Sequence, residues 1–212
     1  VLIEGGTESG GSVTGDATKL QRKLRAFDGQ TTIITGTDTP AVSWKAQLVD
    51  GQTITGTAYV VANGNEAEHR ACYQVDFMAH RPLAELDFDA QTANFTLGNI
   101  ITGATSGATA RLVGQTDGGS TGTLKLRQVS GTFLNNEIIT GSGGGSATVN
   151  GQLVSGDVVV DFATVERSYE PVDMDETAAT VVGAGDEVHV QVTGLATDNV
   201  EWTTQVVATF ST

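Results

Sequence analysis

The residues that could act as nucleophiles in this sequence lie in settings that do not activate them. A Gly-x-Ser-x-Gly string at 118–122 would make Ser120 a nucleophile, but such an elbow needs a strand before the serine and a helix after it. The segment that follows, TLKLRQV, is typical of a strand, so we expect a hairpin turn instead. The single cysteine, Cys72, lies in the alternating run ACYQVDFMA without the signature of a cysteine hydrolase. We therefore expect no catalytic nucleophile.

Metal binding is the second chemistry that the residue types allow. The sequence has three histidines, His69, His80 and His189, and their spacing does not match a zinc-binding motif. The best group of acids for a cation, in the string PVDMDET, consists of Asp173, Asp175 and Glu176. Calcium needs several oxygen ligands from one folded loop, and the twelve-residue pattern with its glycine is absent from this sequence. Two alternatives stay open: a divalent-cation site, with Asp186 as a further ligand, or an acidic loop at a rim.

Phosphate binding and sugar chemistry have less support. The glycine-rich strings at 143–145 and 183–185 are not followed by Lys-Ser/Thr or by a long helical pattern, which a phosphate loop requires. The 25 acids single out no carboxylate pair for glycoside hydrolysis. The aromatic residues that could form a sugar platform are Trp44, Trp202, Tyr59, Tyr73 and Tyr169. Their place in alternating runs favours core packing, and we expect a non-enzymatic protein without a cofactor.

The charge of the chain argues against nucleic acid as a partner. The formal net charge is −14, whereas binding to phosphate backbones needs a basic surface. Residues 1–30 are neutral, and the excess is densest over 157–201, where eleven acids accompany one base, Arg167. We interpret this stretch as a solvated, self-repelling surface. No apolar run approaches the length of a transmembrane helix, so no membrane partner is expected.

Most of the chain has the pattern of short antiparallel strands. Runs such as TTIIT, AVSWKAQLV, QTITGTAYVVA and HRACYQVDFMAH are separated by turn signals such as Asp50-Gly51. The same strand pattern recurs near the end of the chain, in DVVVDFATVERSYE, EVHVQVTG and VEWTTQVVATF. We predict an all-β protein: an antiparallel, jelly-roll-like β-sandwich formed by 31–90 and 155–212, with a small β module of 91–154 inserted in a loop.

The N-terminal segment, 1–30, differs from the rest. Residues 1–16 are rich in Gly, Ser and Thr and are expected to form an extended arm. Asp16 can then cap a short helix through ATKLQRKLRAF, in which Leu20 and Leu24 are four residues apart. The basic residues of this helix are Lys19, Arg22, Lys23 and Arg25. Two interpretations stay open: docking on an acidic neighbour, or a helix that caps the body of the protein.

One sequence motif occurs twice in the chain. FTLGNIITGATSGATARLV at 95–113 is followed by FLNNEIITGSGGGSATV at 133–149. Each copy supplies a Phe, an Ile-Ile-Thr-Gly strand and a second short strand through Ala-Thr, and aligning them needs one extra residue within 142–146 of the second copy. A single copy could not bury enough apolar surface to be stable. We therefore predict pseudo-twofold pairing that buries Phe95, Ile101, Phe133 and Ile139, together with Leu112 and Val149.

Two groups of motifs resemble proteins of tailed-bacteriophage particles. The string GATSGATA at 103–110, echoed by SATV at 146–149, resembles small β repeats of virion proteins. Three further strings resemble a β-sandwich domain of phage head fibres, decoration proteins and tail fibres: AYVVAN at 58–63, EAEHRACYQVDFMAHR at 66–81 and VTGLATDNVEWTTQVVATF at 192–210. The resemblance covers most of the chain after residue 40, except that the family usually has a short connection where this chain has its insert.

The resemblance implies a non-enzymatic structural protein on the virion surface, either a capsid decoration or a head-fibre protein. It would dock through its N-terminal arm on the major capsid protein or another virion protein. Surface proteins of this kind are usually trimers, and an apolar sheet edge favours assembly, so we expect a homotrimer whose contacts include 91–154. The alternative is a tail-fibre protein or a receptor- or carbohydrate-binding module.

Overall fold

The described part of the chain consists of β-strands. A computed structural model describes residues 24–35, 39–64, 69–169, 174, 177–196 and 199–211, and the fourteen elements within these ranges are all strands. Every strand pair among them is antiparallel. The predicted all-β, antiparallel class is therefore confirmed. In the same ranges, no helix has the length and apolar character needed to cross a bilayer.

The first strand takes the place of the end of the expected N-terminal helix. In β1 (Leu24–Thr35), Leu24 pairs with Thr209 and Phe27 pairs with Val206. The helix prediction is wrong for these residues, because the sheet supplies partners for their backbone groups whereas a short helix alone is marginal in water. The rest of the predicted helix and the arm, including Lys19, Arg22 and Lys23, lie outside the described residues.

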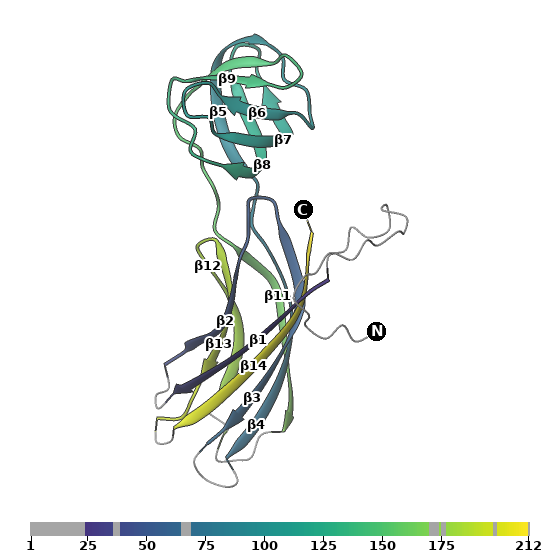
Figure 1. Cartoon of the computed structure of the whole chain (residues 1–212), viewed down its shortest axis with the longest axis vertical. Coiled ribbons are helices and arrows are strands. Elements are labelled where there is room, and N and C mark those ends of the chain that lie inside the picture. Colours follow the sequence, from purple (N-terminus) through teal and green to yellow (C-terminus); the bar gives the residue numbers. More distant parts are fainter. Residues whose placement is uncertain are drawn as a thin grey trace, which may run out of the picture.

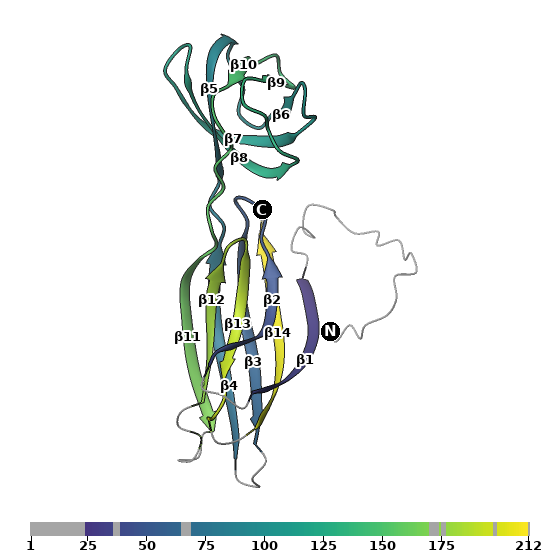
Figure 2. The same ribbon diagram turned by 90° about the vertical axis from the view of Figure 1, so that its left-hand side faces the viewer.

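Two sheets form one half of the molecule, which we call the two-sheet unit (Figures 1 and 2). The larger sheet has the order β1-β14-β3-β4-β11, with β14 at Val200–Ser211, β3 at Thr53–Asn63, β4 at Arg70–His80 and β11 at Val159–Tyr169. The smaller sheet has the order β12-β13-β2, with β12 at Ala178–Ala184, β13 at Glu187–Thr193 and β2 at Ala41–Gln47. Segments from both ends of the chain therefore build this unit together.

Strict alternation of side chains creates the core between these two sheets. Along β4, every second residue from Ala71 to Ala79 is buried, and the residues between them face outward. Trp44 of the smaller sheet packs against Phe77 of the larger one, with ring centroids 6.4 Å apart. Trp202 lies 6.2 Å from Tyr73 in the same core. The inward face of each sheet thus supplies the large side chains that hold the pair together.

The other half of the molecule is a closed six-stranded barrel with its own core. Its order is β10-β5-β8-β7-β6-β9, with β5 at Ala84–Ala93, β6 at Ile100–Gly103, β7 at Thr109–Asp117, β8 at Gly122–Ser130, β9 at Ile138–Gly141 and β10 at Ser146–Val149. Ala84, Leu86 and Phe88 are buried in this core, and β5 pairs with β8 and β10. The barrel therefore begins at Ala84, before the expected boundary at residue 91.

The two copies of the repeat make equivalent contacts in the barrel. β6 and β9 pair about Thr102 and Thr140, which lie opposite one another. In the first copy the Leu112 backbone bonds to Gly98 and Asn99, and in the second the Val149 backbone bonds to Asn136 and Glu137. The four predicted core side chains are all buried in this barrel: Phe95, Ile101, Phe133 and Ile139. The repeat is thus a pair of hairpins related by a local twofold axis.

The one-residue difference between the copies is a deletion in the second copy, not the insertion that the sequence alignment suggested. Ala110 pairs with Ile101, and the equivalent partner of Ile139 is Ala147. The turn of the first copy is closed by Gly103 N–H to the carbonyl of Ala108, and that of the second by Gly141 N–H to the carbonyl of Gly145. Matching the two Ala-Thr pairs by letter placed the second strand two residues out of position, because backbone pairing rather than letter identity fixes the register.

Candidate binding surfaces and polar clusters

The outward surface of the larger sheet exposes several large apolar side chains, and we call it the outer sheet face. Tyr59 and Val61 of β3 are 46% and 43% exposed, and both alternate with buried residues. Val207 of β14 lies on the same face because it pairs with Thr57. Phe162 of β11, which is 48% exposed, lies there because it pairs with Met78, the partner of Thr55. A sheet face of this kind is suited to contact with another protein.

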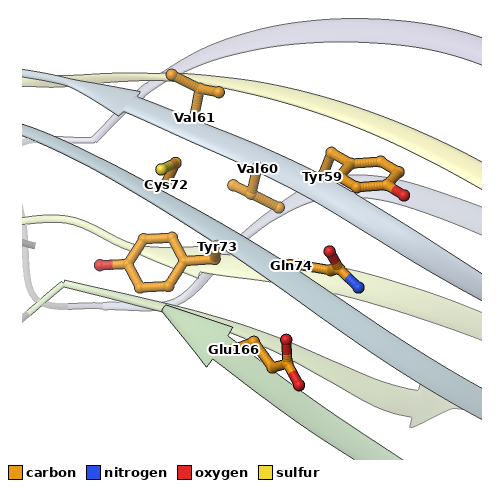
Figure 3. Close-up of a pocket in the computed structure, with 7 residues that line it drawn as sticks. All are labelled: Tyr59, Val60, Val61, Cys72, Tyr73, Gln74 and Glu166. Atoms are coloured by element: carbon orange, nitrogen blue, oxygen red, sulfur yellow. The ribbon is translucent and has the colours of Figure 1, made fainter. Parts of the chain in front are cut away.

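A shallow pocket of about 240 Å³ lies on β3, β4 and β11 (Figure 3). Its lining includes Tyr59, Val61, Cys72, Gln74 and Glu166. Tyr59 and Gln74 are cross-strand partners, and Gln74 is in turn opposite Glu166. The pocket therefore places the exposed ring of Tyr59 beside one amide and one carboxylate. Cys72 is partly exposed on this surface, and the residues that line the pocket include no basic group.

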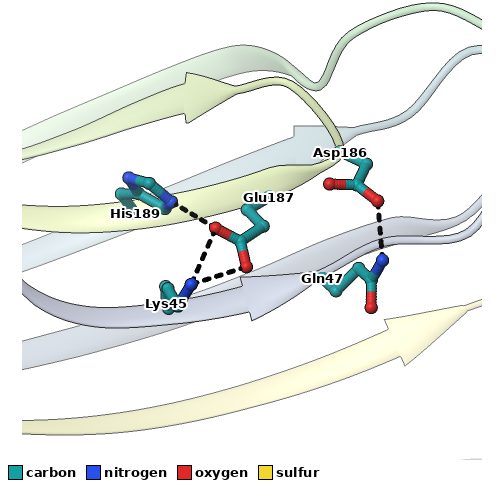
Figure 4. A network of polar contacts seen from close by, with 5 residues as sticks. All are labelled: Lys45, Gln47, Asp186, Glu187 and His189. Atoms are coloured by element: carbon teal, nitrogen blue, oxygen red, sulfur yellow. Dashed lines mark hydrogen bonds and ion pairs between the residues drawn. The ribbon is translucent and has the colours of Figure 1, made fainter.

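An ion-pair network lies on the smaller sheet (Figure 4). Lys45 Nζ is 2.9 Å from Glu187 Oε1, and His189 Nε2 is 2.8 Å from Glu187 Oε2. The hydrogen bond from Lys45, followed by that of His189, lowers the pKa of the Glu187 carboxyl. Beside it, Gln47 donates to Asp186 at 2.6 Å. Since these residues come from neighbouring strands β2 and β13 and the turn before β13, the network links the two strands across their paired positions.

The junction between the two-sheet unit and the barrel is organised by Arg81, directly after β4. Its Nη1 donates to the carbonyl of Leu48 at 3.0 Å, and its Nε donates to that of Gly156 at 3.1 Å. The same Nε lies 3.4 Å from Oδ1 of Asp50, whose side chain is buried. Arg81 thus ties the turn after β2 to both chain segments that lead to the barrel.

Glu137 is a buried acid at the start of β9. Its carboxylate accepts hydrogen bonds from the backbone of Thr105, Ser106 and Leu134 at 3.1, 2.9 and 2.6 Å, and from Ser106 Oγ at 2.8 Å. Burial acts to raise the pKa of Glu137, but these hydrogen bonds outweigh burial and lower it. Glu137 therefore closes two turns at once. Sequence reasoning missed this role, although an acid within an almost uncharged repeat was a usable signal.

Most of the candidate catalytic and metal-binding side chains from the sequence analysis lie apart from one another in the structure. Ser120 lies in the turn between β7 and β8, so the predicted hairpin is confirmed. His80 contacts Asp161 and His189 contacts Glu187. Asp173, Asp175 and Glu176 lie outside the described residues, and in the remainder no three His, Cys, Asp or Glu side chains are grouped to hold a metal ion.

The aromatic candidates divide in a similar way. Trp44, Trp202 and Tyr73 are buried in the core, whereas Tyr59 is on the outer sheet face. The side chain of Tyr169 is outside the description, as is that of Arg25, whose backbone belongs to β1.

Comparison with known proteins identifies no relative. No family model matches the chain, and neither a curated protein nor a solved structure matches it.

Proposed function

We propose that this protein is a non-enzymatic structural protein of a tailed-phage virion, displayed on the particle surface as a capsid decoration or head-fibre protein. We assign its two-sheet unit to the jelly-roll-like β-sandwiches of such proteins and its barrel to an inserted module. The observation that carries the proposal is the outer sheet face, where Tyr59, Val61 and Phe162 remain exposed. Burial of such a face against another protein is favourable, and an assembled particle provides the partner.

Self-association fits the distribution of charge. Copies of a chain with a net charge of −14 repel one another, so they meet best where carboxylates are few. The barrel, 84–154, has five acids and three bases and hence a charge of −2, and its exposed apolar residues include Ile100 and Ile138 at equivalent positions of the two copies. A homotrimer that uses the barrel and the outer sheet face would keep most acidic side chains in solvent.

Docking on the particle is assigned to the N-terminal segment. The basic residues Lys19, Arg22, Lys23 and Arg25 directly precede or begin β1, which is the edge strand of the larger sheet. Their charge is complementary to an acidic surface of the major capsid protein or another virion protein. An edge strand can also extend the sheet of a neighbour.

The test is re-binding to phage particles that lack this protein. We expect the purified chain to saturate such particles and electron microscopy to locate it on the head. Replacement of all four basic residues by Gln should abolish re-binding. The matched control replaces Lys45 and Lys125, which belong to the body of the protein, and should re-bind normally. A chain that is monomeric and does not re-bind would contradict the proposal.

The pocket beside Tyr59 favours a second candidate, a receptor- or carbohydrate-binding module of a tail fibre. Aromatic rings next to amide and carboxylate groups are typical of saccharide sites. Binding on a glycan array that Tyr59→Ala abolishes, with labelling of the tail rather than the head, would favour this candidate.

A further inference from the structure

Two arginines face each other on the outside of the barrel. Arg111 of β7 and Arg127 of β8 are directly opposed in the strand pairing. Their neighbours Ala110, Leu112 and Leu126 are buried in the barrel core, so both arginine side chains point away from that core. Like charges at directly opposed positions of a sheet are destabilising. A negatively charged group next to the two arginines would offset this repulsion.

No carboxylate of the described chain supplies that group. Neither Arg111 nor Arg127 forms an ion pair or a side-chain hydrogen bond there, whereas Lys125 on the same strand lies 3.8 Å from Glu85. Arg127 Nε is buried and has no hydrogen-bond partner. A Cβ on Gly51 would lie 2.9 Å from this nitrogen. The carboxylate next along the chain belongs to Asp50, whose Oδ1 lies 3.4 Å from Arg81 Nε and is itself buried without a hydrogen bond, and it forms no ion pair with Arg127. A buried donor left in this state is costly unless a ligand accepts from it.

The two arginines line an open pocket of about 420 Å³, together with Gly98, Leu112, Val113 and Gln128. Gln128 has a φ of +53°, in the left-handed region that is unfavourable for a residue with a side chain. Its backbone N–H points to the carbonyl of Asp50 at 3.4 Å, so the two-sheet unit helps to hold this conformation. Local backbone strain of this type is concentrated at ligand-binding sites. The volume suits a molecule larger than an inorganic ion.

From these observations we propose that Arg111 and Arg127 bind an oxyanion: the carboxylate, sulfate or phosphate group of a small molecule. Planar guanidinium groups match such oxygens with paired hydrogen bonds. The net charge of −14 disfavours polyanions at long range, which points to a ligand with one acidic group. The site does not depend on the proposed virion function.

The test is titration calorimetry at low ionic strength with four probes: sulfate, phosphate, acetate and glucuronate. We expect saturable binding of at least one probe, and the preferred probe distinguishes tetrahedral anions from carboxylates. Arg111→Gln and Arg127→Gln should each weaken binding about tenfold or more, the loss expected for one charge-assisted contact. The matched control is Lys125→Gln, because Lys125 has the same charge and strand as Arg127 but its own acidic partner.

A second readout keeps the test informative if a variant is less stable. The bound anion should raise the melting temperature of the wild-type protein and of Lys125→Gln, but not of Arg127→Gln. Absence of binding by all four probes would overturn the proposal. Equal weakening by Lys125→Gln would also overturn it, because that result indicates diffuse surface charge and not a site.

Discussion

Asn99 and Glu137 occupy the same position in the two copies of the repeat, and each lies against the turn of the other copy. Glu137 bonds to Thr105 and Ser106, in the turn after the first Ile-Ile-Thr-Gly strand. Asn99 lies against Gly143, in the turn after the second, so closely that a Cβ there would be 2.1 Å from its amide nitrogen. The local twofold axis therefore relates these two polar side chains as well as the strands. Of the two, only Glu137 carries a charge.

Loss of the Glu137 charge should destabilise the barrel selectively. We expect Glu137→Gln to lower the free energy of unfolding of the barrel by about 1–3 kcal/mol, because an amide cannot accept all four hydrogen bonds. Amide hydrogen exchange of peptides from 84–154 measures this change. Tryptophan fluorescence should not change, since both tryptophans and all three tyrosines lie outside the barrel. The exposed acid Glu85, replaced in the same way, is the control and should change stability by less than about 0.5 kcal/mol.

The same carboxylate gives the barrel a defined response to acid. Its pKa is lower in the folded protein than the ordinary value of 4.5, so the folded state binds fewer protons than the unfolded state. The stabilisation is complete above the ordinary pKa and is lost as the pH falls through the lowered pKa. The stability difference between wild type and Glu137→Gln should therefore be largest at neutral pH and should shrink in strong acid. A constant difference across this range would contradict the assigned role.

Arg81 should contribute far more to the stability of the two-sheet unit than an exposed lysine does. We expect Arg81→Met to lower the free energy of unfolding of the two-sheet unit by about 3–5 kcal/mol, because it leaves the buried Asp50 carboxylate without its partner. Adding Asp50→Asn should restore part of the loss. Urea titration followed by tryptophan fluorescence reports on this unit. Lys45→Met removes an exposed ion pair and should cost less than about 1 kcal/mol; equal losses for the two variants would show that the junction is not specially dependent on Arg81.

The outer sheet face should determine the oligomeric state. The double change Tyr59→Thr and Val61→Thr keeps strand-forming residues but removes apolar area. We expect a trimer for the wild type in sedimentation and a shift to monomer for this variant. Val49→Thr also removes an exposed valine, away from this face, and should leave the trimer intact. A monomeric wild type at micromolar concentration would contradict both the predicted trimer and the predicted role of the outer sheet face in forming it.

Two deletions should separate the barrel from the two-sheet unit. Glu85 and Val154 exchange backbone hydrogen bonds, so the chain segments at the junction lie side by side and a two-residue turn can close them. Removal of 84–154 should give a soluble protein with native tryptophan fluorescence. Removal of 91–154 leaves Leu86 and Phe88 without their core and should cause aggregation. If both shortened chains are soluble, β5 does not depend on the barrel.

Alternation of side chains was enough to predict most strands of the two-sheet unit, because burial of one face imposes a period of two, as along β4. The duplicated motif predicted burial of Phe95, Ile101, Phe133 and Ile139, because one copy alone cannot bury enough apolar surface to be stable. The sequence could not place β5, whose alternation is equally compatible with either half of the molecule. It also could not reveal the Arg111–Arg127 pair. These residues are separated in sequence, and only the bulged register of β7 and β8 brings them opposite each other.

The barrel is attached through β4 and β11, which are neighbours in the larger sheet and lead to it side by side, along the long axis of the molecule (Figure 2). A tensile force on the barrel would therefore pull both strands lengthwise. The hydrogen bonds between β3 and β4 lie across that direction, so they would be loaded in shear and would resist together. We therefore expect the sheet to resist a pulling force on the barrel without separating strand by strand.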